Sequence, residues 1–408
     1  MIIADLHIHS KYSRATSKAI DIYNLEKWAK IKGVNLLGTG DFTHPKWIKH
    51  IKETLEQKDN GILVSKNGFN FILQTEISLM YSQGGKGRRV HLTILAPNLE
   101  VADQIIEALL KKGRLDYDGR PIFGFSGIEL VEMMEDIGDK IEIIPAHIWT
   151  PWFGVLGSKS GFDSIEEAFQ EKARKIHAVE TGISSDPAMN WRLSGLDKFQ
   201  LVSFSDMHSA WPWRIGREAT LFDVELSYKN ILSAIRTGGG LNSTVETDPG
   251  YGIYHFDGHR NCNVVFDPKE SIKHKDICPV CNKPLTIGVQ HRVEVLSDRE
   301  EGFKPKNAKP FLTLIPLTEL IAAYLGIKML NSKGVWEVYN KLIKFFDNEF
   351  NILMNVAEID LGKVVNEKLA KIIIDNRHGK ISIKPGYDGL YGKVDLGAAN
   401  PQKNLSGF

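Results

Sequence analysis

Two histidines stand close to the start of the chain, in the segment Asp5-Leu6-His7-Ile8-His9. The residues before them have the pattern of a short buried strand, and side chains two positions apart on an extended chain point to the same side. Neutral imidazoles held in this way are good ligands for zinc, manganese or iron. A single His-x-His pair is a weak signal on its own, so the prediction depends on ligands that follow other strands.

Histidines and carboxylates recur at the edges of the strands expected next. Those strands cover residues 34–37, 69–77, 90–95, 141–145, 176–179 and 201–204, and their edges carry Asp41, Glu76, His91, His147, Glu180, Asp206 and His208. In α/β barrels the carboxyl ends of the strands converge on one face. Any one of these residues alone is more often hydrogen-bonded or a helix N-cap. Their recurrence at successive strand edges predicts a metal centre.

Helical periodicity alternates with these strands, over residues 22–32, 46–57, 100–112 and 128–136. Such alternation is typical of an α/β fold with largely parallel strands, in a barrel or a doubly wound sheet. Residues 90–95 follow the glycine-rich, basic turn Gly84–Arg89 and are expected to form the return strand of a hairpin.

The composition bounds the class of protein. The chain has 408 residues, of which 42% are hydrophobic and 25% charged, as in a globular protein with a large core. The net charge is only +1, so any surface that binds nucleic acid must be local. No apolar run is long enough to span a bilayer and no signal segment is evident, so the expected location is cytoplasmic, without a membrane partner.

All three cysteines lie in one short segment. His259-x-x-Cys262 is followed by Cys278-x-x-Cys281, and two pairs with two-residue spacers are typical of a closed, structural zinc site. An odd, clustered set of cysteines argues against a disulfide framework. The fourth zinc ligand stays open, because His255, His274 and His291 compete with His259.

These patterns divide the chain into four segments. A barrel is expected over residues 1–245, a zinc-binding module over 246–305, and a helical module over 306–372, where helical patterns cover 312–343 and 345–357. A basic, glycine-rich segment completes the chain at 373–408.

The strand-edge residues resemble the polymerase and histidinol phosphatase (PHP) superfamily in content and order. The resemblance implies a distorted (β/α)7 barrel that holds two or three divalent ions (zinc, manganese or magnesium) for phosphoester hydrolysis. It implies that His7, His9, Glu76 and Asp206 bind one metal, and that Glu76 bridges to a second one bound by His91 and His147. A third site would use His208 and Asp41, although Arg14, Ala15 and Phe42 replace ligands that the family usually has there.

Together with the zinc-binding and helical modules, the chain resembles the endonuclease Q family of DNA repair nucleases over essentially its whole length. The resemblance implies damaged DNA as the partner, flipping of the damaged nucleotide, and a nick 5′ to a deaminated base (hypoxanthine, uracil or xanthine) or an abasic site, leaving 3′-hydroxyl and 5′-phosphate ends. The alternatives are a small-molecule phosphatase of the PHP superfamily, which leaves the added modules unexplained, and a non-catalytic DNA-binding scaffold, which should have lost several ligands.

Several further residues are candidates for contacts with DNA. Trp149, Trp152 and Trp211 follow ligand-bearing strands, where aromatic rings can stack on an extruded base. Asp186, Asn190 and Arg192 lie in a polar segment after a barrel strand and are proposed as part of the substrate pocket. Basic clusters at 86–89, 273–275 and 377–384 indicate local contacts with phosphates.

The last seven residues have the spacing of a peptide that binds a sliding clamp. Gln402, Leu405 and Phe408 occupy its first, fourth and seventh positions. The sliding clamp, proliferating cell nuclear antigen, is therefore a predicted partner, since a tether of this kind raises the local concentration of a repair enzyme at DNA.

Overall fold

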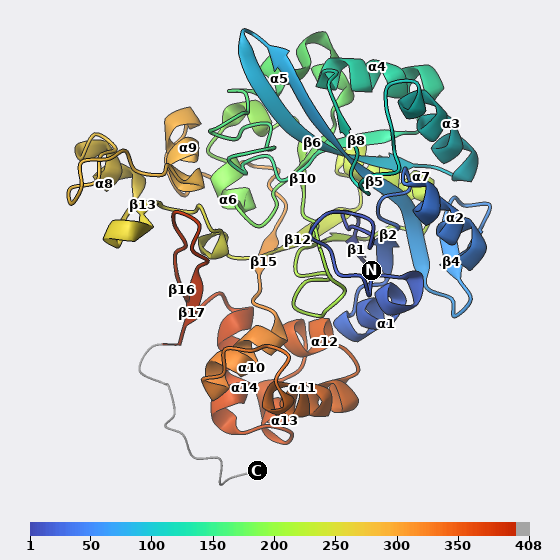
Figure 1. The fold of residues 1–408 in the computed structure, drawn as a ribbon. Coiled ribbons are helices and arrows are strands. Elements are labelled where there is room, and N and C mark those ends of the chain that lie inside the picture. The colour runs from blue at the N-terminus through green and yellow to red at the C-terminus, as the bar shows by residue number, and fades with distance from the viewer. Residues whose placement is uncertain (397–408) are drawn as a thin grey trace.

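Strand β1 (Ile2–Asp5) lies at the centre of the largest sheet in the computed structural model, which describes residues 1–396 (Figure 1). It pairs in parallel with β2 (Leu36–Gly38) and antiparallel with β11 (Ala219–Phe222). Three of its four residues are buried. The strand ends at Asp5, so the two histidines follow it directly.

The sheet continues from β1 in both directions and is mixed, whereas the sequence predicted largely parallel strands. On one side β2 is parallel to β5, β5 is antiparallel to β6, and β6 is antiparallel to β8; on the other side β11 is antiparallel to β12. The bounds are β5 (Asn70–Gln83), β6 (Lys86–Ala96), β8 (Glu142–Pro145) and β12 (Leu241–Glu246). The predicted hairpin is confirmed and reverses the strand direction, but its turn is only Gly84–Gly85, because β6 already begins at Lys86.

A separate parallel pair, β9 (Ala178–Glu180) and β10 (Gln200–Val202), closes the barrel. Strand β9 packs beside β8. After β10, Met207 forms a bridge with Ile8, and its carbonyl accepts a hydrogen bond from the His9 amide at 3.3 Å. The segments that follow the first and the last of these strands therefore lie side by side.

Helices cover the outside of the barrel (Figure 1). Most begin at a side-chain cap that satisfies a free amide: Asp21, Asn98, Ser126 and Ser227 each accept a hydrogen bond from the backbone three residues on. The helices are α1 (Ile22–Lys32), α2 (Pro45–Thr54), α3 (Leu99–Leu110), α4 (Gly127–Ile137), α5 (Ile165–Phe169), α6 (Pro187–Asn190) and α7 (Tyr228–Thr237). Small edge strands are β3 (Leu55–Gln57), β4 (Leu63–Ser65) and β7 (Ile122–Phe123).

The zinc-binding module interrupts the barrel sheet. Its elements are β13 (Asp257–His259), β14 (Val264–Phe266), α8 (Pro268–Lys273) and α9 (Val289–Leu296). The chain then returns to the sheet as β15 (Phe311–Thr313), which pairs in parallel with β12. The hairpin of β16 (Ser382–Lys384) and β17 (Lys393–Asp395) lies near this module in Figure 1, and the Phe256 amide donates to the Gly386 carbonyl.

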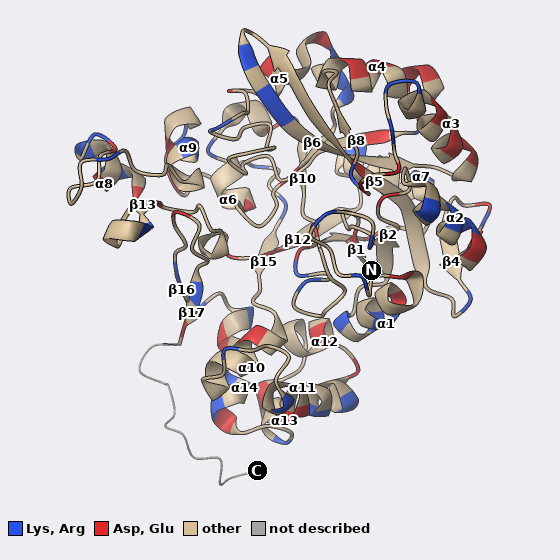
Figure 2. Cartoon of the chain, in the orientation of Figure 1, with Lys and Arg blue, Asp and Glu red and all other residues tan. Residues whose placement is uncertain are grey.

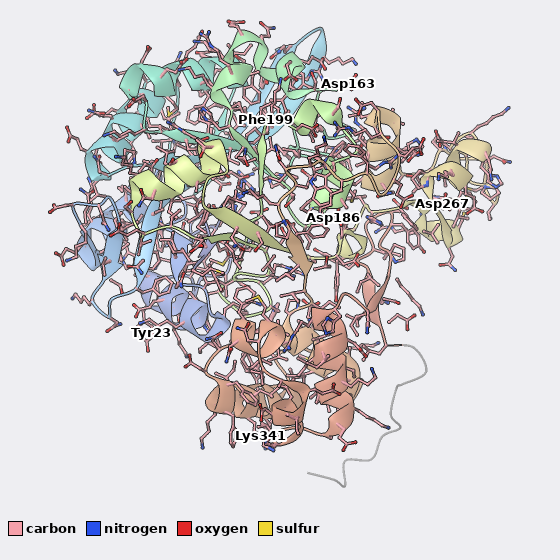
Figure 3. The ribbon with its side chains drawn as sticks, turned by 180° about the vertical axis from the view of Figure 1, so that it is seen from behind. Tyr23, Asp163, Asp186, Phe199, Asp267 and Lys341 are labelled. Atoms are coloured by element: carbon pink, nitrogen blue, oxygen red, sulfur yellow. The ribbon has the colours of Figure 1, made fainter. Side chains whose placement is uncertain are left out.

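The helical module packs below the barrel in Figure 1. It consists of α10 (Leu317–Leu325), α11 (Lys333–Phe346), α12 (Glu349–Met354), α13 (Glu358–Gly362) and α14 (Glu367–Arg377). Seen from behind in Figure 3, Tyr23 of α1, Asp267 before α8 and Lys341 of α11 mark the barrel, the zinc-binding module and the helical module. Lysines and arginines are spread over all three of these parts (Figure 2).

Three predicted helices differ from the structure. Of residues 345–357, only the first two, at the end of α11, and the six of α12 are in these helices. Residues 46–57 were expected to be helical throughout, but α2 ends at Thr54 because Leu55–Gln57 pairs with β4. Residues 312–343 contain β15 and two helices, since Pro316 precedes α10, Gly326 ends it in a left-handed conformation, and Ser332 caps α11. Among the described residues, no helix has the length and apolarity needed to cross a membrane.

A buried ion pair fastens the helical module to the barrel. Lys32, at the end of α1, donates to Glu349 of α12 at 2.7 Å and to the carbonyl of Pro212 at 2.9 Å, and both charged side chains are almost wholly buried. Glu349 also accepts from the Tyr339 hydroxyl and the Leu317 amide. This junction holds together α1, the helical module and the loop that follows His208.

Replacing Lys32 by methionine is expected to lower the free energy of unfolding by about 3–5 kcal/mol, because Glu349 would be left charged and buried without its cation. Lys30→Met is the matched control: Lys30 is half exposed, and the buried Glu26 keeps its hydrogen bonds from Ser65 and Asn67, so the loss should be only about 1 kcal/mol. Urea unfolding of both variants measures the difference. Equal effects would show that the junction carries no special share of the stability.

Candidate metal centre

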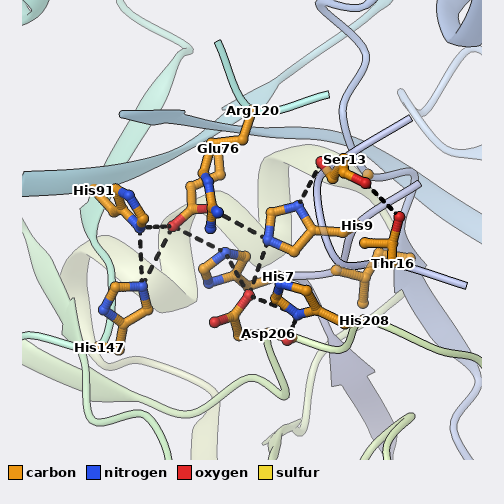
Figure 4. A network of polar contacts seen from close by, with 12 residues as sticks. His7, His9, Ser13, Thr16, Glu76, His91, Arg120, His147, Asp206 and His208 are labelled. Carbon is orange, nitrogen blue, oxygen red and sulfur yellow. Dashed lines mark hydrogen bonds and ion pairs between the residues drawn. The ribbon is translucent and has the colours of Figure 1, made fainter. Parts of the chain in front are cut away.

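Glu76 of β5 is the hub of a buried cluster of histidines and carboxylates (Figure 4). Its Oε1 lies 2.8 Å from His91 Nδ1, 3.3 Å from His147 Nε2 and 3.5 Å from His7 Nε2. Its Oε2 lies 3.2 Å from His9 Nε2. Four strand-edge histidines therefore meet one carboxylate in space, although they span 140 residues of sequence.

Two groups in this cluster have the geometry to hold a cation. His7, His9, Glu76 and Asp206 form one, and Glu76, His91 and His147 form the other; in each, one ligand atom per residue lies within 4.8 Å of all the others. Glu76 belongs to both groups. The ligand sets predicted for the first two metals, with Glu76 as the bridge, are thus brought together by the fold.

The histidines are oriented by groups behind them. His7 Nδ1 lies 2.8 Å from Glu180 Oε2, and His9 Nδ1 lies 3.0 Å from Asp41 Oδ1. A carboxylate on one imidazole nitrogen fixes the tautomer and directs the lone pair of the other nitrogen. In both residues the other nitrogen, Nε2, faces Glu76 and Asp206.

The donor set fits divalent metal ions. His7 Nε2 is fully buried and makes no hydrogen bond, which is costly unless a further partner occupies the site. Burial lowers the pKa of His91 to about 4 and keeps its imidazole neutral. Burial opposes ionisation of Glu76, but His91, Arg120 and His7 hold its pKa well below the usual value. Burial opposes protonation of His7, His9 and His147, but the carboxylates around them raise the pKa of all three, so each would have to release its proton to bind a metal.

The backbone is strained at three of the strand-edge positions. Asp41, His147 and Asp206 have φ values of 37°, 32° and 45°, in the left-handed region that residues other than glycine rarely adopt. Such conformations cost about 1–3 kcal/mol each and tend to cluster at functional sites. Here they occur where the chain leaves a strand and enters the cluster.

Asp41 and His208, the two residues predicted for a third metal site, have other partners in this structure. Its Oδ1 faces His9, while Oδ2 accepts from the Ser10 amide, the Ser10 hydroxyl and the Ser13 hydroxyl. Its oxygens are occupied, so Asp41 positions His9. His208 is partly exposed, and its Nδ1 faces the Asp206 carbonyl at 2.9 Å. Among residues 1–396, Asp41 and His208 belong to no candidate metal group.

Two residues near the centre were absent from the predicted site. The sequence places Glu180 at a strand edge, like the predicted ligands, but Glu180 was not assigned to a metal site. Arg120 donates to Glu76 Oε2 at 3.0 Å and is 20% exposed. In the sequence it lies in the loop before β7 and does not follow any of the strands that carry ligands. No spacing pattern could therefore have identified it.

The predicted substrate residues fall into two sets. Trp149 is fully buried and donates from its indole to Asn190, which is also buried. Arg192 is buried against Glu294 and Ser297 of the zinc-binding module, and Asp186 caps α6. A base cannot reach the Trp149 ring in this structure; Trp149, Asn190 and Arg192 hold neighbouring segments together.

Trp152 and Trp211 are accessible. They are 38% and 40% exposed, on the loops that follow His147 and His208. Trp152 packs against Tyr254, and Trp211 stacks on Trp213 with ring centres 5.2 Å apart. Trp211 also packs against Trp28 and Trp336, so other tryptophans cover part of its ring.

The four residues of the zinc-binding module also converge. His259, Cys262, Cys278 and Cys281 form a group with the same compactness, and His259 Nδ1 lies 3.3 Å from Cys281 Sγ. Burial opposes ionisation of Cys278, but the amides of Cys281 and Val280 lower the pKa of its thiol to about 6. Of the competing histidines, His291 pairs with Asp257 and His274 stacks on Phe266. The geometry selects His259 as the fourth ligand.

Comparisons with known proteins agree with this architecture. Residues 316–380, most of the helical module, match the family model "MJ0043 C-terminal domain". Protein MJ0043 of Methanocaldococcus jannaschii is 34% identical over 261 residues, 62% of this chain but only 32% of MJ0043. Protein YqxK of Bacillus subtilis is 29% identical over 96% of this chain and 99% of its own length.

Two solved structures match the whole chain. The lesion-specific endonuclease PfuEndoQ from Pyrococcus furiosus has a TM-score of 0.87 at 30% identity, covering 99% of this chain and 97% of its own. Endonuclease Q in complex with a 27-mer duplex that carries an abasic lesion at the active site has a TM-score of 0.86 at 30% identity, covering 99% of both chains.

Barrel, strand-edge cluster and added modules define a protein of the PHP superfamily with a zinc-binding and a helical module. Within that superfamily, the chain belongs to the endonuclease Q family.

Proposed function

We propose that this protein is a metal-dependent DNA repair endonuclease that cuts the strand 5′ to a deaminated base (hypoxanthine, uracil or xanthine) or an abasic site. The observation that carries the proposal is the cluster around Glu76, in a chain whose fold matches a lesion-specific endonuclease from end to end. The abasic duplex bound at the active site of the second neighbour supports damaged DNA as the substrate.

The chain's residues would divide the work. His7, His9, Glu76 and Asp206 would hold one cation, and Glu76, His91 and His147 a second one. When bound, such ions would supply positive charge at the phosphate and lower the pKa of a water molecule. Glu180 and Asp41 keep the imidazoles of His7 and His9 in the ligand tautomer. Magnesium, manganese and zinc are the candidates for the barrel, and zinc for the His/Cys group.

Arg120 is proposed to bind the scissile phosphate. Its guanidinium donates one hydrogen bond to Glu76 and has further N–H groups beside the cluster.

Hydrolysis adds water to phosphorus and breaks the bond between phosphorus and the 3′ oxygen, which takes up a proton. The products are a 3′-hydroxyl and a 5′-phosphate.

The test is a denaturing-gel assay on labelled duplexes with one central deoxyinosine, deoxyuridine or abasic site, beside an undamaged duplex. Each is incubated with magnesium, manganese or zinc. We expect a single cut 5′ to the lesion, none in the undamaged duplex, and none with His7→Ala, since His7 would hold a cation. A His7→Ala variant that cuts at the normal rate would overturn the metal assignment.

This gel assay, together with a phosphate-release assay on small phosphomonoesters, decides between the alternatives. Release of phosphate from small phosphomonoesters without any DNA cleavage would favour the phosphatase. DNA binding without hydrolysis of either substrate would favour the non-catalytic scaffold. A cytoplasmic location stays a prediction, as does clamp binding, because Gln402, Leu405 and Phe408 lie outside the described residues.

A further inference from the structure

A groove runs along β6, between the β5–β6 hairpin and the loop of residues 150–161. It consists of two adjoining hollows of about 500 and 430 Å³, which share Gly87, Arg88, Lys159 and Ser160. The hairpin extends well beyond the barrel, and its free end carries basic residues (Figures 1 and 2). No role in the chemistry at Glu76 requires this extension.

The far wall of the groove is a compact loop fixed to β6. The His91 amide donates to the Phe153 carbonyl at 2.9 Å, and the Arg89 amide donates to the Ser160 carbonyl at 3.2 Å. Gly157 is required inside this loop, because a Cβ there would collide with the Thr150 carbonyl. Both walls are therefore held in place without a ligand.

The lining carries unneutralised positive charge. Arg88 is paired with Glu167 at 2.9 Å, and Arg292 is paired with Asp163 at 2.7 Å, so both lining carboxylates are occupied. The other three cations, Lys86, Arg89 and Lys159, are exposed, and their side chains make no ion pair or hydrogen bond with any part of the chain that the structure describes. The hydroxyl of Ser158, in the same lining, is buried without a hydrogen-bond partner.

The inner end of the groove adjoins the metal centre. Trp152 lines it, and the next residue, Phe153, packs on the ring of His91 at 4.3 Å. Trp152 also contacts Tyr254 of the zinc-binding module at 5.3 Å. A DNA strand in the groove would thus lead from the hairpin tip to His91, one of the candidate metal ligands.

We propose that this groove binds the phosphate backbone of duplex DNA, with Lys86, Arg89 and Lys159 each contacting a phosphate. The inference rests on the proposed function and adds the path of the substrate. Lys86 lines one of the two hollows, Arg89 lines the other, and Lys159 lines both. Exposed cations without protein partners, in a mostly polar groove, are suited to the repeating phosphates of a DNA backbone. Such contacts do not depend on the base sequence.

The test is the salt dependence of DNA binding by the full-length protein. The groove variant is K86Q/R89Q/K159Q. The matched control is K49Q/K112Q/R114Q, which removes the same charge from exposed positions outside the groove that are already paired with carboxylates. Binding to a fluorescent duplex with one abasic analogue is measured without added divalent cations from 50 to 300 mM KCl. The same duplex without the lesion is measured in parallel.

We expect the groove variant to bind both duplexes more weakly by about two to three orders of magnitude at 0.1 M salt, and the slope of log K against log salt to fall by about 2.7, or 0.9 per lost phosphate contact. Cleavage by the groove variant at saturating DNA should keep its rate. The control should change affinity less than twofold.

If the groove variant kept the wild-type slope of log K against log salt and still cut damaged DNA, the proposed role of the groove would be wrong. The proposed function would stay intact. Loss of affinity equal to that of the control would overturn the role of the groove as well. A wild-type protein that binds no duplex would instead overturn the proposed function.

Discussion

Replacing Glu76 by glutamine is expected to reduce cleavage of lesion-bearing DNA by at least about a thousandfold, close to the uncatalysed background. Glu76 faces four imidazoles and Arg120, and it belongs to both candidate metal groups. Glutamine has the same shape but no charge. Both proposed cations would therefore lose the negatively charged ligand that they share. Removing the group that unites two metals should cost more than removing any single histidine.

Three measurements check this expectation. Metal content after dialysis should fall by at least one ion per chain, single-turnover cleavage should be lost, and circular dichroism should keep the wild-type spectrum. Glu142→Gln is the matched control, because Glu142 is also buried in a barrel strand but pairs with His177 and Arg236. A Glu76→Gln protein that keeps its metals and its rate would show that the cluster is structural.

Replacing Cys278 by serine is expected to remove one zinc ion per chain and to unfold the zinc-binding module locally. Cys278 is fully buried and lies with His259, Cys262 and Cys281 in a closed group of four ligands. Apparent binding energies of structural zinc reach about 10–16 kcal/mol in small zinc-binding domains, where metal binding and folding are one event. The apolar cluster around Cys278 contains only a few residues, so it cannot hold the module by itself.

Zinc content by mass spectrometry and hydrogen exchange across residues 257–296 would measure both effects. DNA affinity should fall as well, while the barrel keeps its protection. Val280→Ser is the control, since Val280 is 66% exposed in the same turn and offers no ligand. If Cys278→Ser retained its zinc and its exchange protection, the His/Cys group would not be a structural metal site.

The sequence by itself indicated the candidate ligands of both centres, except for the fourth ligand of the His/Cys group. His7, His9, Glu76, His91, His147 and Asp206 could be identified because strand periodicity marks where each strand ends, and strand ends in a barrel share one face. The cysteine spacers marked the zinc-binding module in the same way. Both signals are local in the chain, and local patterns are what a single sequence records.

Only the tertiary structure decided which residues serve as ligands and which support them. Asp41 and Glu180 both follow strands, but only their distances to His9 and His7 show that they orient imidazoles. Trp149 and Trp152 are three residues apart, yet one is sealed in the core and the other exposed. Arg120 reaches Glu76 across 44 residues of sequence. Burial and contact depend on segments far apart in the chain, whose approach no spacing within one segment encodes.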